Sequence, residues 1–150
     1  MPSSWTQNYY HLVFSTKGRE PLICSTIHER LYAFMGGIAK DLGGQLIAGN
    51  GMPDHAHLLV RYPPDLANSV LSREVKARSS RWVHETLPDL AGFGWQRGYG
   101  GFTVSRSAVA EVEAYIRNQV EHHQTMTFQE EFLLLLRKHG VEFDAKYVFE

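Results

Sequence analysis

The stretch Asp54-His55-Ala56-His57-Leu58-Leu59-Val60-Arg61 decides the fold, because its apolar and β-branched residues predict a strand. Successive side chains of a strand point to opposite faces of the sheet. His55 and His57 therefore project from one side, near enough to share a metal ion, while Ala56 and Leu58 point into a core on the other side. On its own the histidine pair is a weak signal, since such pairs are more often solvent-facing or hydrogen-bonded than metal-bound.

Strand and helix signals alternate on both sides of this stretch. The other predicted strands cover 9–15, 45–48 and 95–105, and a turn-rich link covers 49–53. The predicted helices, with the residues expected to cap them, are 26–42 (capping box Thr26 and Glu29), 66–78 (Asp65) with a second piece over 79–85, 107–124 (Ser107), and 127–139 (capping box Thr127 and Glu130). The tail over 141–150 is expected to pack as an extended segment.

This order, β-α-β-β-α-β followed by two helices, is the ferredoxin-like or RRM-like pattern. We therefore expect an α+β fold, with helices on one face of an antiparallel sheet and a helical C-terminal addition that carries Tyr115. A chain of 150 residues without repeats, low-complexity stretches or a linker predicts one domain over 1–150.

The composition, with 43% hydrophobic and 21% charged residues, argues against disorder and against a coiled coil. Cys24 is the only cysteine, so no intrachain disulfide can form, which suits the cytoplasm, where we expect the protein. The first ten residues show no apolar signal core, and the longest aliphatic run, 133–136, is too short to span a bilayer.

The net charge of −1 conceals an uneven distribution. Residues 61–106 carry an excess of arginine and lysine, whereas acidic residues predominate from 111 onward. A nearly neutral chain can still have a basic face, and phosphate binding depends on the local electrostatic potential rather than on the net charge. Ordinary solvated surface charge explains these counts equally well.

A second group of residues lies on the predicted helix over 107–124. Tyr115 and Gln119 are four residues apart and are expected one turn apart on one helix face, while Val112, Ile116 and Val120 form an apolar stripe for docking on the sheet. A tyrosine on a helix is usually half-buried packing. Beside an imidazole-bound divalent ion, however, its phenol could attack a polarised phosphate and store the bond as a phosphotyrosine.

The stretch 51–60, Gly-Met-Pro-Asp-His-Ala-His-Leu-Leu-Val, resembles the HUH motif (His, hydrophobic, His) of the single-tyrosine transposases of bacterial and archaeal insertion sequences. Four further blocks resemble the same family and occur in the family's order: 10–17, 76–82, 94–99 and 115–123. The middle residue of the motif, Ala56, is smaller than the aliphatic residues common there, which loosens local packing without removing a ligand.

The resemblance implies a function and a set of site residues. His55, His57 and Gln119 would bind Mg²⁺ or Mn²⁺, and Tyr115 would form a 5′-phosphotyrosine while the enzyme cleaves and rejoins DNA at insertion-sequence ends. The implied partners are single-stranded DNA with hairpins at the element ends and a second copy of the chain. In such a homodimer the tyrosine helix serves its own or its partner's histidines.

Other basic and aromatic residues are candidates for DNA contact through phosphates or base stacking: Lys17, Arg19, Lys76, Arg78, Arg81, Trp82 and Arg97. A solvated helix face is an equally good interpretation of the four residues over 76–82. His122 and His123 are expected to be supporting or surface histidines rather than direct ligands. Phe128, Phe132 and the run 133–136 are expected in the core or in a dimer contact.

Three other functions remain open from sequence. A domesticated relative that processes repeated extragenic palindromes would use the same catalytic residues. A non-catalytic module that binds single-stranded nucleic acid would use the same fold. A hydrolytic Zn²⁺ enzyme is the weakest alternative, because the sequence places no carboxylate among the histidines and the tyrosine.

Overall fold

The computed structural model describes residues 3–149 and has the predicted α+β architecture. The helices and strands are β1 (Asn8–Ser15), α1 (Ser25–Asp41), β2 (Gln45–Met52), β3 (His55–Tyr62), α2 (Asn68–Thr86), β4 (Gly100–Val104), α3 (Val109–Arg117), α4 (Gln119–His122) and α5 (Phe128–Lys138). Three single turns of 3₁₀ helix, η1 (Lys17–Arg19), η2 (Pro88–Leu90) and η3 (Arg106–Ala108), lie between them. Within residues 3–149, no helix is both long and apolar enough to cross a membrane.

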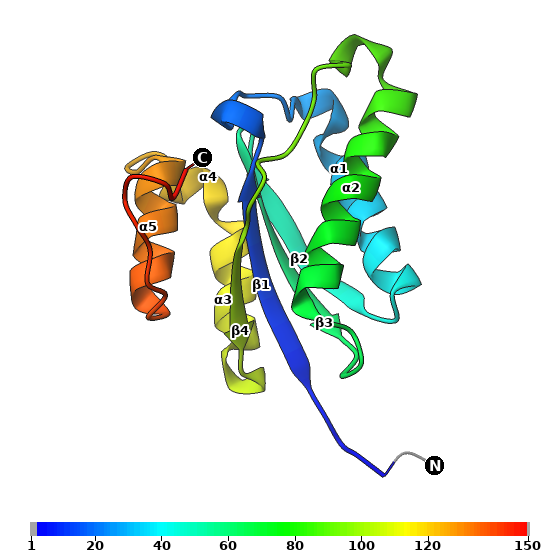
Figure 1. Ribbon diagram of the computed structural model, residues 1–150, viewed down its shortest axis with the longest axis vertical. Helices are drawn as coiled ribbons and strands as arrows, with labels where there is room; N and C mark the ends of the chain where they lie inside the picture. The colour runs from blue at the N-terminus through cyan, green and yellow to red at the C-terminus, as the bar shows by residue number, and fades with distance from the viewer. Residues whose placement is uncertain (1–2, 150) are drawn as a thin grey trace.

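The four strands form one sheet in the order β2-β3-β1-β4, and all neighbouring pairs are antiparallel. This is the strand order of the ferredoxin-like pattern, so that prediction is confirmed. The two crossover helices α1 and α2 lie together on one side of the sheet, while α3, α4 and α5 lie on the other (Figure 1). The sheet therefore has helices on both faces, and the C-terminal helices form the second layer.

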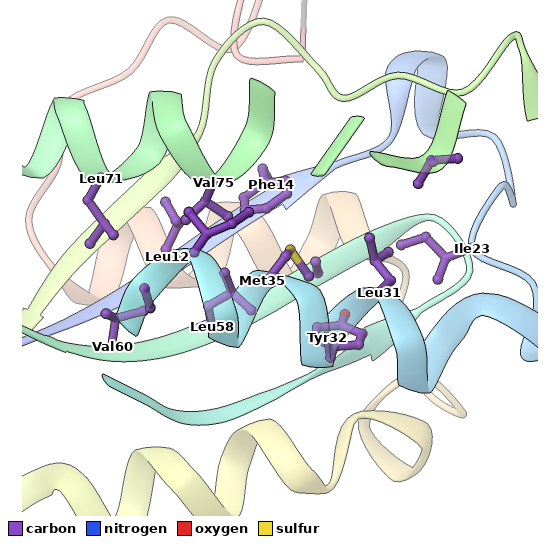
Figure 2. Packing of buried hydrophobic residues seen from close by; sticks show 14 of the residues in the cluster. Leu12, Phe14, Ile23, Leu31, Tyr32, Met35, Leu58, Val60, Leu71 and Val75 are labelled. Atoms are coloured by element: carbon purple, nitrogen blue, oxygen red, sulfur yellow. The ribbon is translucent and has the colours of Figure 1, made fainter. Parts of the chain in front are cut away.

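The two-residue period of β1 and β3 divides the core between these layers. Leu12 and Phe14 of β1 and Leu58 of β3 pack against α1 and α2 (Figure 2). On the opposite face, Leu59 packs with α3, and Val13 packs with α5. Each such fully buried side chain contributes about 1.5–3 kcal/mol. The same alternation directs His55 and His57 toward α3, α4 and α5.

The second strand is longer than predicted, because the expected turn over 49–53 is mostly strand. β2 runs to Met52, with an irregularity between Leu46 and Ala48. Its glycines permit close approach rather than a turn. A Cβ at Gly51 would lie 2.2 Å from the carbonyl oxygen of His55 across the hairpin.

The fourth strand is shorter than predicted, covering Gly100–Val104 instead of 95–105. Trp95 makes only an isolated bridge with Thr16. The segment is instead held by Gln96, whose backbone N–H donates to the carbonyl of Ser15 (2.9 Å) and whose side-chain oxygen accepts from the Ser15 N–H (2.6 Å). Side-chain hydrogen bonding here takes the place of a continuous ladder.

Three of the predicted helix caps are wrong. Cys24, not Thr26, precedes α1, and no capping box with Glu29 forms. α2 begins at Asn68, beyond Asp65, and continues through 79–85 without interruption. Ser107 lies within η3, so α3 begins only at Val109. These starts are set by packing on the sheet, which local capping patterns do not encode.

The capping box of the last helix is confirmed, since the Thr127 and Glu130 side chains each bond the other's backbone N–H. The tail after α5 is not simply extended: residues 145–149 form turns, and Phe143, Val148 and Phe149 pack against the α5 cluster. Glu150, the last residue of that predicted segment, lies outside the described residues.

The predicted helix over 107–124 is broken at Asn118 into α3 and α4. The amide of Asn50, on β2, donates to the carbonyls of Ile116 and Arg117, both at 3.1 Å, and so satisfies the end of α3. Tyr115 and Gln119 therefore stand on successive helices rather than on one face of a single helix. The change of direction also leaves Val120 61% exposed instead of docked on the sheet.

Candidate metal and tyrosine centre

His55 and His57 are fully buried at the start of β3, next to the turn of the β2–β3 hairpin. The outward nitrogen of His55, Nδ1, donates to Oδ1 of Asp54 at 2.7 Å, so its Nε2 faces inward. Nδ1 of His57 lies 2.9 Å from Nε2 of His11 on β1, and its Nε2 also faces inward. Contacts to the outward nitrogen are the usual way in which proteins orient a metal-binding imidazole.

A carboxylate from α5 lies at the point where these nitrogens converge. Oε1 of Glu131 is 3.3 Å from Nε2 of His55 and 3.0 Å from Nε2 of His57. His123 approaches the same oxygen with its Nε2 at 3.0 Å. One ligand atom from each of His55, His57 and Glu131 lies within 4.8 Å of the others, the spacing of a metal site.

Tyr115 and Gln119 reach the other oxygen of this carboxylate. The Tyr115 hydroxyl donates to Oε2 of Glu131, and the Gln119 amide donates to the same atom at 3.1 Å. Because the amide nitrogen of Gln119 is used there, its Oε1 is directed at Nε2 of His55, 2.9 Å away. The structure thus brings together all four residues predicted for the centre, although they come from β3, α3 and α4.

The charges in this centre follow from burial and from these contacts. Burial disfavours a charge on Glu131, but hydrogen bonds from His55, His57 and Tyr115 outweigh it and lower its pKa, so it is a carboxylate. Burial likewise lowers the pKa of His55, yet its bonds to Asp54, Glu131 and Gln119 raise it overall to about 9. Burial lowers the pKa of His57, so this imidazole is neutral.

The phenol of Tyr115 is held in its protonated form, because burial and then the Glu131 carboxylate raise its pKa. Burial also raises the pKa of Asp54, but the hydrogen bond from His55 reverses this and lowers it overall. Asp54 is therefore an anion that stabilises positive charge on His55.

The donor set fits a divalent cation. With the outward nitrogens of His55 and His57 turned to Asp54 and His11, the two Nε2 atoms face one carboxylate oxygen and one amide oxygen. Such a convergence of electron-pair donors is unfavourable unless a proton or a cation lies among them. Nitrogen and oxygen donors of this kind bind several divalent metals, so the residues alone do not select one.

Two supporting residues were not singled out by sequence reasoning. Glu131 overturns the statement that no carboxylate lies among the histidines and the tyrosine. Its sequence signal is a charge within the apolar stripe of Phe128, Phe132 and Leu135, at positions that share one helix face. His11 gave a similar signal, as a polar residue inside an apolar strand.

His122 and His123 both lie beside the centre, and the expectation that they support it rather than bind a metal directly stays a prediction. The ring of His122 stacks on Tyr115 with centroids 4.4 Å apart. His123 contacts Glu131 and also directs Nδ1 at the Met126 carbonyl, 2.8 Å away. Of the apolar residues predicted in the core or in a dimer contact, Phe128, Phe132, Leu135 and Leu136 are buried, whereas Leu134 is 52% exposed.

The residues predicted to contact DNA do not form one surface. Lys76, Arg78, Arg81 and Trp82 belong to α2, on the opposite side of the sheet from Tyr115 (Figure 1). Arg78 pairs with Asp41 at 2.8 Å. The Trp82 ring is stacked on Phe34, so it is engaged in packing.

The segment that leads into β4 contains Arg97 and is contacted by Lys76 and Lys17, whereas Arg19 contacts the C-terminal tail. The Lys76 ammonium donates to the carbonyls of Arg97 (3.2 Å) and Gly98 (2.7 Å). Lys17, the first residue of η1, bonds the Gly94 carbonyl through its backbone N–H and leaves its side chain exposed. Arg19 donates to the carbonyl of Phe149 at 3.2 Å, and Arg97 is exposed.

A cavity of about 560 Å³ leads to the centre between β4, α3 and α5. Tyr115, Glu131 and His11 line it, and Lys138 and His139 from the end of α5 contribute polar groups. Its other lining residues are largely apolar. The nucleophile candidate is thus reachable from the surface although the histidines are buried.

The fold is ferredoxin-like, and its buried histidine pair faces a tyrosine on a C-terminal helix. These features define the class of DNA strand-processing proteins that the sequence resembles. The family model described as "Transposase IS200 like" matches residues 4–119. The chain belongs to this family and is a DNA transposase.

Relatives in sequence and in structure agree with this family assignment. The chain is 30% identical over 115 residues to the ISDra2 transposase TnpA of Deinococcus radiodurans, covering 73% of this chain and 82% of that protein. It is 26% identical over 118 residues to the transposase for insertion sequence element IS200 of Salmonella typhimurium, covering 75% and 76%. Among solved structures, a chain from D. radiodurans described as a transposase superposes with a TM-score of 0.66 at 28% identity, covering 79% of this chain and 95% of that one.

A second solved structure, a REP-associated tyrosine transposase bound to a REP hairpin, has a TM-score of 0.60 at 16% identity and covers 82% of this chain and 73% of that one. At this identity it shows a shared fold.

Proposed function

We propose that this transposase cleaves and rejoins single-stranded DNA at insertion-sequence ends through a 5′-phosphotyrosine on Tyr115. The observation that carries the proposal is the convergence of the Tyr115 hydroxyl, the Gln119 amide and the two inward imidazole nitrogens on one buried carboxylate. No packing requirement explains why four polar side chains from three elements should share one point in the interior.

In the proposed reaction the Tyr115 oxygen attacks the scissile phosphorus. A bond forms between phosphorus and the phenolic oxygen, and the bond between phosphorus and the 3′ oxygen breaks. In net terms the phenolic proton passes to the leaving oxygen, so that one strand ends in a free 3′ hydroxyl and the other is joined to Tyr115 through its 5′ phosphate. A 3′ hydroxyl then attacks the phosphotyrosine and releases the phenol, which rejoins the DNA. The two steps exchange phosphodiester bonds of similar energy, so no nucleoside triphosphate is consumed.

His55, His57 and Gln119 are the proposed ligands of Mg²⁺ or Mn²⁺. A bound divalent cation supplies charge neutralisation at the scissile phosphate and at the leaving 3′ oxygen. Asp54 and His11 hold the two imidazoles so that Nε2 of each faces the centre. The chain's own residues therefore fix the ligand nitrogens before any substrate arrives.

DNA with hairpins is the proposed partner. The cavity between α3 and α5 has room for a nucleotide beside Tyr115, and its size falls in the range of small-ligand sites. One relative, that of Salmonella typhimurium, is named as the transposase for an insertion sequence element, IS200. The solved relative bound to a REP hairpin makes palindromic ends a suitable probe.

The test is to incubate the full chain with hairpin oligonucleotides carrying a single-stranded flank, in Mg²⁺ or Mn²⁺, and to detect a covalent protein–DNA adduct by denaturing gel and peptide mass spectrometry. Wild-type protein should form an adduct at Tyr115 that chelation prevents, and Tyr115→Phe should form none. Tyr147→Phe is the matched control, because Tyr147 is an exposed tyrosine away from the centre. An adduct that persists in Tyr115→Phe would disprove the nucleophile assignment.

The same experiment separates the other functions. A non-catalytic nucleic-acid-binding module binds the oligonucleotide with chelator present and never cuts it. A domesticated enzyme forms the adduct with scattered genomic palindromes but not with the ends of an adjacent element.

A homodimer is the proposed assembly. The exposed apolar side chains Val120 and Leu134, on α4 and α5 beside the centre, are suited to a contact between copies. Light scattering after size exclusion should give about twice the chain mass of 17.1 kDa, and Val120→Glu should shift it toward the monomer. A monomeric wild-type protein at micromolar concentration would contradict this assembly.

A further inference from the structure

We propose that Glu131 is itself a ligand of the divalent cation, so that the centre holds its metal with two imidazoles, one amide oxygen and one carboxylate. This inference rests on the metal-dependent function proposed above and adds a residue that the sequence comparison does not supply. The family model ends at residue 119, before α5 begins.

The geometry of the carboxylate carries the inference. Oε1 of Glu131 lies 3.0 and 3.3 Å from Nε2 of His57 and His55, and the three atoms form one compact group. Because Nδ1 of His55 is engaged by Asp54, Nε2 is the nitrogen that can give up its proton and offer a lone pair to a cation. An imidazole nitrogen and a carboxylate oxygen that face each other in the interior need a proton or a cation between them, and the convergence of two such nitrogens on one oxygen suits a shared cation.

The burial of Glu131 has a free-energy cost that a favourable interaction must offset. The carboxylate is 1% exposed and lies on the apolar face of α5, between Phe128 and Phe132. A charge in such a place costs several kcal/mol unless it is fully compensated. Hydrogen bonds from the two imidazoles, the Tyr115 hydroxyl and the Gln119 amide compensate it less well than a divalent cation would.

Metal preference follows from the added oxygen. Imidazole alone favours softer ions, whereas carboxylate and amide oxygens suit Mg²⁺ and Mn²⁺. With Glu131 included, two of the four protein donors are oxygens and the ligand set carries one negative charge. The centre should therefore load its cation in the absence of DNA.

Glu131 also connects the cation site to the nucleophile. While Oε1 faces the imidazoles, Oε2 accepts from the Tyr115 hydroxyl and from the Gln119 amide. One side chain thus sets the position of the phenol relative to the metal ligands, which makes Glu131 a positioning residue for Tyr115 as well.

The test measures Mn²⁺ binding to the DNA-free full chain by the loss of the free-ion EPR signal. Wild type should bind one ion, and Glu131→Gln should bind at least about 10-fold more weakly. Glu121→Gln, which changes an exposed glutamate on α4, should match wild type. Folding of each variant is checked by circular dichroism.

Equal affinity in folded Glu131→Gln overturns the inference but leaves the proposed function intact, provided that His57→Ala abolishes binding. If His57→Ala also binds like wild type, the proposed metal site itself is wrong. If Glu131→Gln does not fold, Mn²⁺-soaked crystals of the wild type decide: an anomalous peak about 2.0–2.4 Å from Oε1 of Glu131 supports the inference, and a peak held by the histidines alone overturns it.

Discussion

At the scale of single residues, Asp54 determines which nitrogen of His55 is available. Its Oδ1 accepts the Nδ1–H of His55, and without this acceptor the ring could turn or change tautomer. We expect Asp54→Ala to weaken Mn²⁺ binding about 10- to 100-fold, as removal of such a partner generally does. Asp54→Asn should lose less, because its amide oxygen still accepts.

Calorimetric titration with Mn²⁺ measures this prediction. Asp89→Ala, which removes an exposed carboxylate in η2, is the control and should bind like wild type. Undiminished binding in Asp54→Ala would show that packing against neighbours such as Phe128, rather than the hydrogen bond, fixes the His55 ring.

At the scale of the elements, the β2–β3 hairpin depends on close contact between its strands. Gly51→Ala would place a Cβ 2.2 Å from the His55 carbonyl, where backbone must move, and we expect it to lower the free energy of unfolding by about 1–3 kcal/mol. In contrast, Gly37→Ala meets nothing within 4 Å in the middle of α1. It should raise the free energy of unfolding by about 0.5–1 kcal/mol. Urea unfolding of both variants measures the contrast, and equal effects would show that the hairpin relaxes freely.

Lys76 connects α2 to the segment before β4 and predicts a pH dependence. Burial lowers its pKa from 10.5 to about 8. Between these values the folded protein binds fewer protons than the unfolded chain, so the free energy of unfolding rises with pH through this window. As pH falls through 8, the ammonium must be charged inside the fold and that stability is lost. Unfolding at pH 7.5 and 9.5 should show this rise in wild type and a smaller one in Lys76→Met. Identical pH slopes would mean that the Lys76 ammonium is well solvated.

The elements also show which features local sequence can predict. The alternation in β1 and β3 identifies both faces of the sheet, because burial on a strand follows a fixed period. The capping box of α5 was predictable because Thr127 and Glu130 contact each other within one turn. The break at Asn118 was not, because it depends on a hydrogen bond from Asn50, distant in sequence.

The residues of the metal and tyrosine centre likewise fall into those that sequence motifs predict and those that only tertiary packing reveals. His55, His57, Tyr115 and Gln119 could be named from motifs, and their convergence followed from a resemblance rather than from spacing. Glu131 could be recognised only as a charge on an apolar helix face. Its partners come from β3, α3 and α4, and their approach is a consequence of tertiary packing.

At the scale of the whole molecule, the two layers of helices separate the basic residues from one another. Lys17 begins η1 just after β1, next to Thr16, whose N–H bonds the Asp54 carbonyl beside His55, whereas Arg81 lies on α2 across the sheet. If DNA binds on the tyrosine side, Lys17→Ala should weaken binding and lower the salt dependence by about 0.7 in log–log slope. Arg81→Ala should change neither.

Fluorescence anisotropy with a labelled hairpin, measured from low to physiological salt, tests this comparison. A larger loss in Arg81→Ala would mean that DNA also runs over α2, and that the distribution of charge along the sequence describes the binding surface better than the position of the catalytic tyrosine does.

The amide of Asn50 has a further consequence, for the chemical ageing of the protein. Asn50 is followed by Gly51, and an asparagine before glycine deamidates readily where the backbone is free, because glycine leaves the attacking amide nitrogen unhindered. Pairing in β2 restrains that reaction. Once converted to aspartate, residue 50 would direct a carboxylate at two carbonyl oxygens of α3 instead of donating to them. Storage or heating should therefore inactivate the enzyme by releasing the tyrosine helix, with deamidation at Asn50, followed by mass spectrometry, advancing in step with the loss of adduct formation.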